Sequence, residues 1–389
     1  MCGISGIFSN KDKNFSFYKT IIEKMIIKLN HRGPDDRGEW IEPNNGIAFG
    51  HTRLSILDLS SKGKQPMQSK NNQYTIIFNG EIYNHLDLRK EVENFSNNKN
   101  YLWSGFSDTE TLLNCFECWG IEETLNKSTG MFSLAVWDHK EKKLVLARDR
   151  FGEKPLYFLK DKGNFFFGSE TKFIRILLNN YKVINNKKIY QYLKNGYKSI
   201  EASNETFFKG IFKVKSGTNL IIKKNLTIKE TTYWRPKIDE KNFSEKKCAQ
   251  LIRENFEKKI KDICDTDLKI GLSLSGGIDS SLISILLKEV SKCKKLEVIR
   301  LIHCNSIDDN CIKSITDNCS NLKYLDVACC LYITDKSLNF LSQKSKKLET
   351  IYLHGGPLGN INITDDGITT LSSGCVNIKN IMLAYLPNI

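Results

Sequence analysis

The sequence predicts three regions: an α+β region over 1–235, the opening of an α/β unit over 236–290, and a short solenoid of repeats over 291–389. Three observations support this division. In the first region, apolar runs of strand length alternate with turns rich in Gly and Asn. In the second, an amphipathic helical pattern leads into an apolar run and a Gly-rich turn. In the third, one sequence unit recurs at a nearly constant spacing, as solenoid repeats do.

The composition is that of an ordinary globular protein. The chain has 389 residues, of which 40% are hydrophobic and 26% charged, enough for two or three domains of ~100–200 residues. Its net charge of +14 comes from lysines scattered along the chain, which favours a solvated basic surface over a nucleic-acid site. The most apolar run, 282–287, is far shorter than the ~18–20 residues of a membrane helix. We therefore expect no nucleic-acid partner and no membrane partner.

The cysteines and the amino terminus bear on the compartment. The 12 cysteines are not accompanied by a secretory signal, since the chain begins Met-Cys-Gly-Ile without a basic stretch or a long apolar stretch. We therefore expect reduced thiols in a cytoplasmic protein. Cys115 and Cys118 have the spacing of a zinc-binding pair, but no second pair lies near them in the sequence, so we expect them to pack in a helix.

Hydrophobic periodicity predicts the elements of the first two regions. In the first region, strands are expected at 46–53, 74–79, 132–138, 143–148 and 164–168. Helices are expected there near 17–29 and 108–119. In the second region, we expect a helix over 245–261, a strand over 268–274 and a further helix from Asp279.

The third region repeats the pattern L-x-x-L-x-L, then a turn, then Ile-Asp or Thr-Asp before a short helix. Four copies begin at Cys293, Cys319, Ser345 and Cys375, at spacings of 26, 26 and 30 residues. The pattern resembles cysteine-containing leucine-rich repeats, which implies a short solenoid whose cysteines pack as small apolar residues. The concave face of the solenoid either binds a protein partner or is an ordinary solvated surface. Its expected residues are Arg300, Asp326, Tyr352 and Met382.

The amino terminus carries the first candidate for chemistry. If initiator Met1 is removed, as a small second residue permits, Cys2 carries both a thiol and a free α-amine. An α-amine has a reference pKa of ~7.7–8.0, so it can take the thiol proton near neutral pH. One residue then supplies a nucleophile and its base. Taken alone, a cysteine at position 2 is weak support for this interpretation.

Six blocks in a fixed order strengthen it, among them Phe78-Asn-Gly-Glu-Ile-Tyr-Asn84. The blocks lie at 2–4, 31–36, 50–56, 78–84, 107–110 and 147–157. Their order and residues resemble the glutamine-hydrolysing asparagine synthetases. The resemblance implies that 2–235 is a class II glutamine amidotransferase domain with the four-layer αββα fold of N-terminal-nucleophile (Ntn) hydrolases. It also implies that L-glutamine is hydrolysed to glutamate and ammonia through a thioester on Cys2, without a cofactor.

The resemblance implies a role for each residue that matches a chemical group of glutamine: its α-carboxylate, its α-ammonium or its side-chain amide. Arg53 can pair with the α-carboxylate through its forked guanidinium, and Glu81 with Asp108 can hold the α-ammonium. The donors to the oxyanion formed on attack are assigned by the resemblance to the Asn79 side chain and the Gly80 N–H. The remaining residues of the implied glutamine site are Leu54, Ser55, Ile56 and Leu57.

Each of these polar residues also has a purely structural interpretation. Arg53 would be a surface cation beside a strand. Asn79 and Gly80 would form a hairpin turn, and Asp108 would be a helix N-cap. Considered together with the amino-terminal cysteine, the functional interpretation is favoured.

Two further features concern the surroundings of the expected pocket. His31 and Arg32 are expected to shape the loop beneath it rather than to react, because the α-amine already supplies a base. Phe106 precedes Ser107 and Asp108 at a position where related sequences often have Gly or His. We expect this departure to reshape the rim of the pocket.

The Gly-rich turn of the second region predicts phosphate binding. Ser275-Gly-Gly-Ile-Asp-Ser-Ser281 follows an apolar strand and opens a helix, so backbone N–H groups and hydroxyls there can cradle a phosphate. It resembles the ATP-pyrophosphatase loop of the same synthetase family and lacks the Lys of a Walker A loop. The resemblance implies ATP and Mg²⁺ as cofactors. The residues implied at the ATP site are Leu274, Ser275, Gly276, Gly277, Asp279 and Ser280.

The resemblance to the synthetases stops soon after this loop, because the repeats begin near residue 291. We therefore expect a truncated α/β ATP-pyrophosphatase-type fragment and loss of asparagine synthesis from aspartate. The leading hypothesis is a glutaminase of the asparagine synthetase type. One alternative is a leucine-rich-repeat interaction protein with a vestigial amidotransferase domain. Another is a sugar or phosphoribosyl amidotransferase, against which the 275–281 loop argues.

Overall fold

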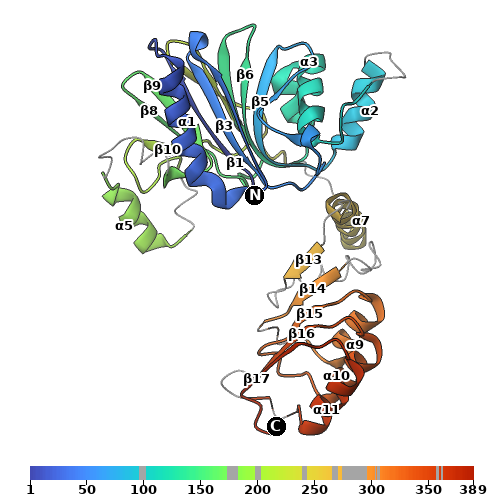
Figure 1. The fold of residues 1–389 in the computed structure, drawn as a ribbon. Helices are drawn as coiled ribbons and strands as arrows, with labels where there is room; N and C mark the ends of the chain where they lie inside the picture. The colour runs from blue at the N-terminus through green and yellow to red at the C-terminus, as the bar shows by residue number, and fades with distance from the viewer. Residues whose placement is uncertain are drawn as a thin grey trace. The chain divides into compact units, whose positions relative to one another are not determined.

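The computed structural model describes residues 1–95, 102–172, 183–197, 203–238, 243–264, 270–273, 296–302, 304, 307–355, 359–360 and 362–389. The chain forms two compact units, Met1–Asp239 and Glu240–Ile389. The units differ in kind, because the first contains antiparallel sheets and the second a parallel sheet (Figure 1).

Two six-stranded sheets form the centre of the first unit, and their strand pairs are antiparallel. The first has the order β10-β8-β9-β1-β3-β2, with strands β1 (Gly3–Ser9), β2 (Asp36–Glu42), β3 (Ile47–Arg53), β8 (Tyr157–Asp161), β9 (Asn164–Gly168) and β10 (Ile211–Lys213). The second has the order β12-β11-β7-β6-β5-β4, with strands β4 (Met67–Gln68), β5 (Tyr74–Ile82), β6 (Gly130–Asp138), β7 (Lys143–Arg148), β11 (Thr218–Ile222) and β12 (Ile228–Thr232).

Packing on the two sheets defines four layers. One core lies between the sheets and includes Phe8, Phe49 and Trp137, all fully buried. Helix α1 (Phe15–Leu29) covers the outer face of the first sheet. Helices α2 (His85–Phe95) and α3 (Asp108–Lys127) pack on the second sheet (Figure 1). This is the αββα order that the resemblance implied. The shorter helices are α5 (Asn186–Asn195), η1 (Asn30–Arg32), η2 (Pro43–Asn45) and η3 (Ser61–Gly63).

Local sequence explains the boundaries of α1. Its N-cap is Asn14, whose side-chain oxygen accepts a hydrogen bond from the Phe17 N–H at 2.9 Å. Tyr18, Ile22 and Met25 are fully buried and recur every three or four residues, so one face of the helix packs on the sheet. The helix predicted near 17–29 is therefore confirmed.

The strands predicted in the first unit are all present, together with strands that the sequence did not reveal. β1 is one of these, because Gly3 and Gly6 interrupt its apolar pattern. A Cβ atom at Gly6 would lie 2.1 Å from the Phe167 ring on the neighbouring strand β9, so packing requires glycine here. The helix predicted near 108–119 is confirmed but continues to Lys127, after a break at Gly120 with φ 79°.

The second unit is a parallel sheet in the order β13-β14-β15-β16-β17. Its strands are β13 (Ile270–Ser273), β14 (Leu296–Arg300), β15 (Tyr324–Asp326), β16 (Thr350–His354) and β17 (Asn380–Ala384). Its helices are α7 (Glu245–Cys264), α9 (Asp309–Asn318), α10 (Asp335–Lys344) and α11 (Asp365–Gly374). The helix predicted over 245–261 and the strand predicted over 268–274 are thus present. The helix expected from Asp279 lies outside the described residues.

Each sequence repeat supplies one strand, and helices α9, α10 and α11 follow β14, β15 and β16. Leu325 of β15 lies beside Ile351 of β16, and both are fully buried in one core with Leu338 and Leu371 of the helices. Ile260 of α7 belongs to the same core. Residues on either side of the sequence-based boundary at 290–291 therefore contribute to one sheet and one core.

Neighbouring repeats are also joined by a recurring polar contact. The Asp309 carboxylate accepts hydrogen bonds from the Thr334 N–H at 2.9 Å and the Thr334 hydroxyl at 2.8 Å. Asp335 accepts the equivalent pair from Thr364, at 2.9 and 2.7 Å. The aspartates at the starts of α9 and α10 therefore fix these helix starts to the next repeat.

The strand positions predicted for a concave face differ in exposure. Arg300, Asp326, Tyr352 and Met382 lie in one row across the sheet. Met382 is 51% exposed, and Arg300 is exposed with its guanidinium 5.1 Å from the Tyr324 ring centroid. Asp326 is instead buried and accepts a hydrogen bond from the Ala328 N–H at 3.1 Å, because the carboxylate turns back to its own loop.

The cysteines that the structure describes are free thiols, in agreement with the sequence prediction. Cys115 is fully buried in the core between α3 and the second sheet, and Cys118 packs at its edge. Within the described ranges, no helix is both long and apolar enough to cross a membrane.

Candidate active site

A pocket in the first unit contains the predicted nucleophile. Its wall comes from the amino terminus, the end of β3 and the segment after it, β5, and the start of α3. All but one of the residues predicted for the glutamine site line it: Cys2, Arg53, Leu54, Ile56, Leu57, Asn79, Gly80, Glu81 and Asp108. The exception is Ser55, whose N–H donates to Asp35 Oδ2 at 2.8 Å.

Cys2 is held at the entrance to β1 by backbone contacts. Its Sγ accepts a hydrogen bond from the Leu54 N–H at 3.4 Å, and its carbonyl accepts one from Arg32 Nε at 3.0 Å. Burial raises the pKa of the Cys2 thiol, so the resting side chain is protonated and needs a base to become a nucleophile. Arg32 also pairs with Glu170 at 3.3 Å, which fits its expected role in shaping the loop beneath the pocket.

The amino-terminal amine lies in an environment that favours its neutral form. With Met1 in place, burial lowers the pKa of this amine, and the positive charges of Arg32 and Lys154 lower it further. Met1 lines the same pocket as Cys2. After removal of Met1, the free amine of Cys2 would lie near the same positive charges, which favour its neutral form.

Asn79 and Gly80 lie within β5, so the hairpin-turn interpretation is wrong. Asn79 pairs with Ser133 and Gly80 with Phe132 of β6. The strand continues through them because β6 satisfies their backbone, although the sequence pattern ended at Asn79. A Cβ atom at Gly80 would lie 2.2 Å from the Met131 carbonyl oxygen, so glycine is required there. The Asn79 side chain is buried, and its Nδ2 lies 3.5 Å from Ser133 Oγ.

Arg53 ends β3 and is only 7% exposed, which rules out the surface-cation interpretation. Its Nη1 donates to the Ser60 carbonyl at 2.8 Å, and its Nη2 donates to the Asp58 carbonyl. The guanidinium thus orders the segment that follows β3 while also lining the pocket. The geometry places a buried positive charge on the pocket wall.

Glu81 and Asp108 provide two carboxylates on the same wall. Asp108 is the first residue of α3, but the N-cap is Ser107, whose Oγ accepts from the Thr109 N–H at 3.1 Å. The N-cap interpretation of Asp108 is therefore wrong. Its Oδ2 instead accepts from the Ile82 N–H of β5 at 3.0 Å. Burial raises the pKa of Asp108 to about 7, with Glu81 nearby adding to the shift, and burial also raises the pKa of Glu81.

This raised pKa predicts a pH dependence of glutamine binding. The resemblance implies that Asp108 holds the α-ammonium of glutamine, which requires its ionised form, and protonation below pH 7 removes that charge. The KM for glutamine should therefore rise by about tenfold per pH unit as the pH falls below 7. His51, beside the pocket, does not titrate in this range because burial lowers its pKa to about 4. Steady-state kinetics from pH 5.5 to 8 measure the effect.

Asp108→Asn is the matched control for this prediction. The variant should bind glutamine weakly at every pH and show a flat KM profile over the same range. An unchanged steep profile in Asp108→Asn would assign the titration to another group.

Sequence reasoning missed several residues of the wall. Gln65 connects two of its segments, since its Oε1 accepts from the Phe78 N–H at 2.6 Å and its Nε2 donates to Thr109 Oγ1 at 3.1 Å. Lys154 is 7% exposed, and burial lowers the pKa of its ammonium. Lys154 lies in the 147–157 block, so its position was flagged, but the resemblance gave it no role.

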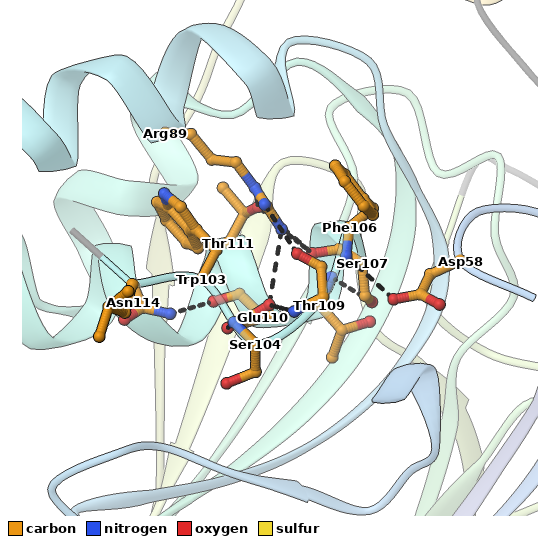
Figure 2. Close-up of polar contacts among 12 residues, drawn as sticks. Asp58, Arg89, Trp103, Ser104, Phe106, Ser107, Thr109, Glu110, Thr111 and Asn114 are labelled. Atoms are coloured by element: carbon orange, nitrogen blue, oxygen red, sulfur yellow. Dashed lines mark hydrogen bonds and ion pairs between the residues drawn. The ribbon is translucent and has the colours of Figure 1, made fainter. Parts of the chain in front are cut away.

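A buried network holds the loop that leads to Asp108 (Figure 2). Arg89 of α2 donates to Thr111 Oγ1 at 2.8 Å and to the carbonyls of Gly105 and Ser107 at 2.9 and 3.0 Å. Its guanidinium also lies 4.1 Å from the Trp103 ring centroid and 3.6 Å from the Glu110 carboxylate. The loop is therefore fixed to α2 from beneath.

Removing the Arg89 side chain should destabilise the first unit. Arg89→Ala leaves Glu110 buried without its cation, which typically costs about 3–5 kcal/mol of unfolding free energy. Arg89→Lys should cost less, because it keeps the charge but loses the fork. Urea unfolding measures both, with the exposed Arg37→Ala as a control expected within about 1 kcal/mol of the parent. Equal losses in Arg89→Ala and Arg37→Ala would contradict this account.

The ATP-site residues implied by the resemblance cannot be placed in the same way. Leu274, Ser275, Gly276, Gly277, Asp279 and Ser280 lie outside the described residues. Among the residues that the structure does describe, no group of three or more His, Cys, Asp or Glu side chains could hold a metal ion.

The fold and the lining of the pocket fit the glutamine amidotransferase class that the resemblance implied, and comparison with known proteins agrees. Residues 1–234 match the family model of the glutamine amidotransferase domain, and residues 251–310 match that of asparagine synthase. The chain therefore belongs to the glutamine amidotransferase family.

Its relatives include asparagine synthetases. It is 33% identical over 290 residues to asparagine synthetase [glutamine-hydrolyzing] 1 of Bacillus subtilis, covering 74% of this chain and 44% of the relative. It is 31% identical over 324 residues to putative asparagine synthetase [glutamine-hydrolyzing] 2 of Methanocaldococcus jannaschii, covering 77% and 59%. Glutamine phosphoribosylpyrophosphate amidotransferase of B. subtilis aligns with a TM-score of 0.43 and 18% identity, covering 75% of this chain and 64% of that chain. The chain thus spans less than two thirds of the length of these curated relatives.

Proposed function

We propose that this chain hydrolyses L-glutamine to L-glutamate and ammonia through a thioester on Cys2. The observation that carries the proposal is the shared pocket, in which the thiol lies with two buried cations, Arg53 and Lys154, and two carboxylates, Glu81 and Asp108. A free α-amino acid with an amide side chain presents the matching groups. The joint presence of all these groups favours an enzyme over an interaction protein with a vestigial site.

In the proposed reaction, the free α-amine of Cys2 takes the thiol proton as Sγ attacks the amide carbon of glutamine. The negative charge that develops on the amide oxygen is stabilised by the Asn79 side chain and the Gly80 N–H. The protonated amine then gives its proton to the departing nitrogen, which leaves as ammonia. Water attacks the resulting thioester by the reverse sequence of proton transfers and releases glutamate.

The two ends of the substrate are held by opposite charges. Arg53 pairs with the α-carboxylate, and Glu81 with Asp108 holds the α-ammonium. Leu54, Ile56 and Leu57 cover the apolar carbon chain. The grip on both α-groups selects a free amino acid over a glutamine residue in a peptide.

We propose that the strand–helix units of the second unit are leucine-rich repeats. Support comes from the spacing of the repeats, the parallel strands and the single core of Leu and Ile side chains. A protein partner on the exposed strand face stays a proposal, with Arg300 and Met382 as its available side chains. We also propose that the protein is located in the cytoplasm.

We also propose that this chain releases ammonia without making asparagine. The asparagine synthase match covers residues 251–310, and residues beyond it form repeat strands and helices. Any ATP and Mg²⁺ would bind through the 274–280 loop, whose contribution to the activity is therefore expected to be small.

Purified protein incubated with glutamine tests the main proposal, by assay of glutamate and ammonia. Equimolar formation of both is expected. A second arm adds ATP, Mg²⁺ and aspartate, and assays asparagine and pyrophosphate. Stoichiometric formation of both would overturn the proposal about asparagine, and absence of glutamate in either arm would overturn the proposal of glutaminase activity.

A further inference from the structure

Arg53 and Asp108, which bind the two α-groups of glutamine in the proposed function, lie on segments that are far apart in the sequence. Arg53 orders the segment that follows β3, through the carbonyls of Asp58 and Ser60. Asp108 follows the loop 102–107 at the start of α3. The α-carboxylate and α-ammonium of glutamine are attached to one carbon atom, so the distance between these two segments must match a short substrate.

The Asp58 carboxylate joins the two segments (Figure 2). Its Oδ2 accepts a hydrogen bond from the Phe106 N–H at 2.9 Å, and its Oδ1 accepts one from the Ser60 N–H at 3.0 Å. One oxygen therefore binds each segment. Although burial opposes it, the hydrogen bonds from Ser60 and Phe106 lower the pKa of Asp58, so the carboxylate stays charged at neutral pH.

The local backbone is shaped for this contact. Asp58 has φ 55°, in the left-handed region that few residues other than glycine adopt, and such strain is kept where the surroundings require it. On the opposite side, a Cβ atom at Gly105 would lie 2.5 Å from Asp58 Oδ2. Glycine at 105 therefore lets the carboxylate reach the Phe106 N–H.

The loop that receives Asp58 is fixed independently. Arg89 binds the Gly105 and Ser107 carbonyls, and the Glu110 carboxylate accepts from the Ser104 and Gly105 N–H groups at 2.7 and 2.9 Å. Asp58 thus docks the segment after β3 onto a loop that is already held from beneath.

We propose that Asp58 is a positioning residue that fixes the spacing between the carboxylate-binding and ammonium-binding sides of the pocket. Asp58 does not line the pocket, so we expect it to act on the substrate only through other residues. It acts through the segment that follows Arg53. It therefore affects the binding of a ligand that contacts the carboxylate-binding and ammonium-binding sides at the same time. This inference rests on the proposed function and names a residue that determines its specificity.

The test compares a ligand that carries both the α-carboxylate and the α-ammonium with a ligand that carries the carboxylate alone. In a Cys2→Ala background, which prevents turnover, calorimetry measures the Kd of L-glutamine and of glutaramate, which has the same carboxylate and amide but no amine. Asp58→Ala should weaken glutamine binding by about 10- to 100-fold and glutaramate binding by less than about threefold. A purely structural role would weaken both ligands equally, and that result would overturn the proposal.

Two variants and one control guard against misfolding. Gly105→Ala breaks the same contact from the other side and should reproduce the selective loss, while Asp58→Asn, which keeps one acceptor oxygen, should restore part of it. Asp87→Ala, on the exposed face of α2, should change neither Kd. Hydrogen exchange of the Phe106 amide should accelerate in Asp58→Ala. Unchanged glutamine affinity in Asp58→Ala overturns the positioning role alone, whereas a parent protein that binds no glutamine overturns the proposed function as well.

Discussion

Replacing Cys2 with alanine is expected to abolish glutamine hydrolysis while leaving the fold intact. In the proposed reaction this side chain supplies the attacking sulfur, and the described residues of the pocket wall include no other thiol that could replace it. Loss of a catalytic nucleophile typically lowers kcat by about 10⁴-fold or more. An uncleaved extension before Cys2 should have a similar effect, because it converts the free amine into an amide that cannot accept a proton.

Ammonia release measured on Cys2→Ala and on the protein with the uncleaved extension tests this prediction. Mass spectrometry establishes the amino-terminal residue of each. Cys248→Ala, a partly buried cysteine of α7 in the second unit, is the matched control and should retain the parent rate. Hydrolysis that survives both the alanine substitution and the extension would assign the nucleophile to another residue.

Asn79→Ala is expected to lower kcat by about 10²- to 10³-fold with little change in KM. The Asn79 amide is proposed to donate to the oxyanion, which exists only after attack, so its loss affects the transition state more than the bound substrate. Asn79 is buried on a central strand, so the donor is already oriented before the substrate arrives.

The control for this prediction is Asn219→Ala. Asn219 is a buried asparagine on β11 of the same sheet, where its side chain accepts a hydrogen bond from Thr231. Its loss should affect stability but not kcat. A rise in KM alone in Asn79→Ala would place the side chain in substrate binding instead.

The sequence predicted elements with a clear period and missed those whose pattern is set by packing. α1 was found because its apolar residues recur every three or four positions, and β7 because it is a continuous apolar run of strand length. β1 was missed because Gly3 and Gly6 interrupt its apolar run, and distant side chains require both glycines: Thr52 crowds Gly3 and the Phe167 ring crowds Gly6. The end of β5 was misplaced for a similar reason, since pairing with β6 overrides the turn preference of Asn-Gly.

For the pocket, most of the residues that line it were predicted, and those that hold the lining in place were not. Cys2, Arg53 and Asp108 occur in recognisable blocks, so the resemblance identified them. Arg89 and Asp58 act through backbone atoms of a loop distant in sequence. Contacts of this kind depend on how segments meet in space, which spacing along the chain does not encode.

The pairing of β13 with β14 depends on the direction of the two strands rather than on their side chains. The edge of a parallel sheet presents backbone donors and acceptors that a further parallel strand can satisfy whatever its side chains. β14, from the first repeat, satisfies them for β13. β13 is the outermost of the described strands in this sheet, so β14 satisfies one of its two edges. What a parallel sheet of this kind demands of the segment beside β13 is therefore strand direction rather than residue identity.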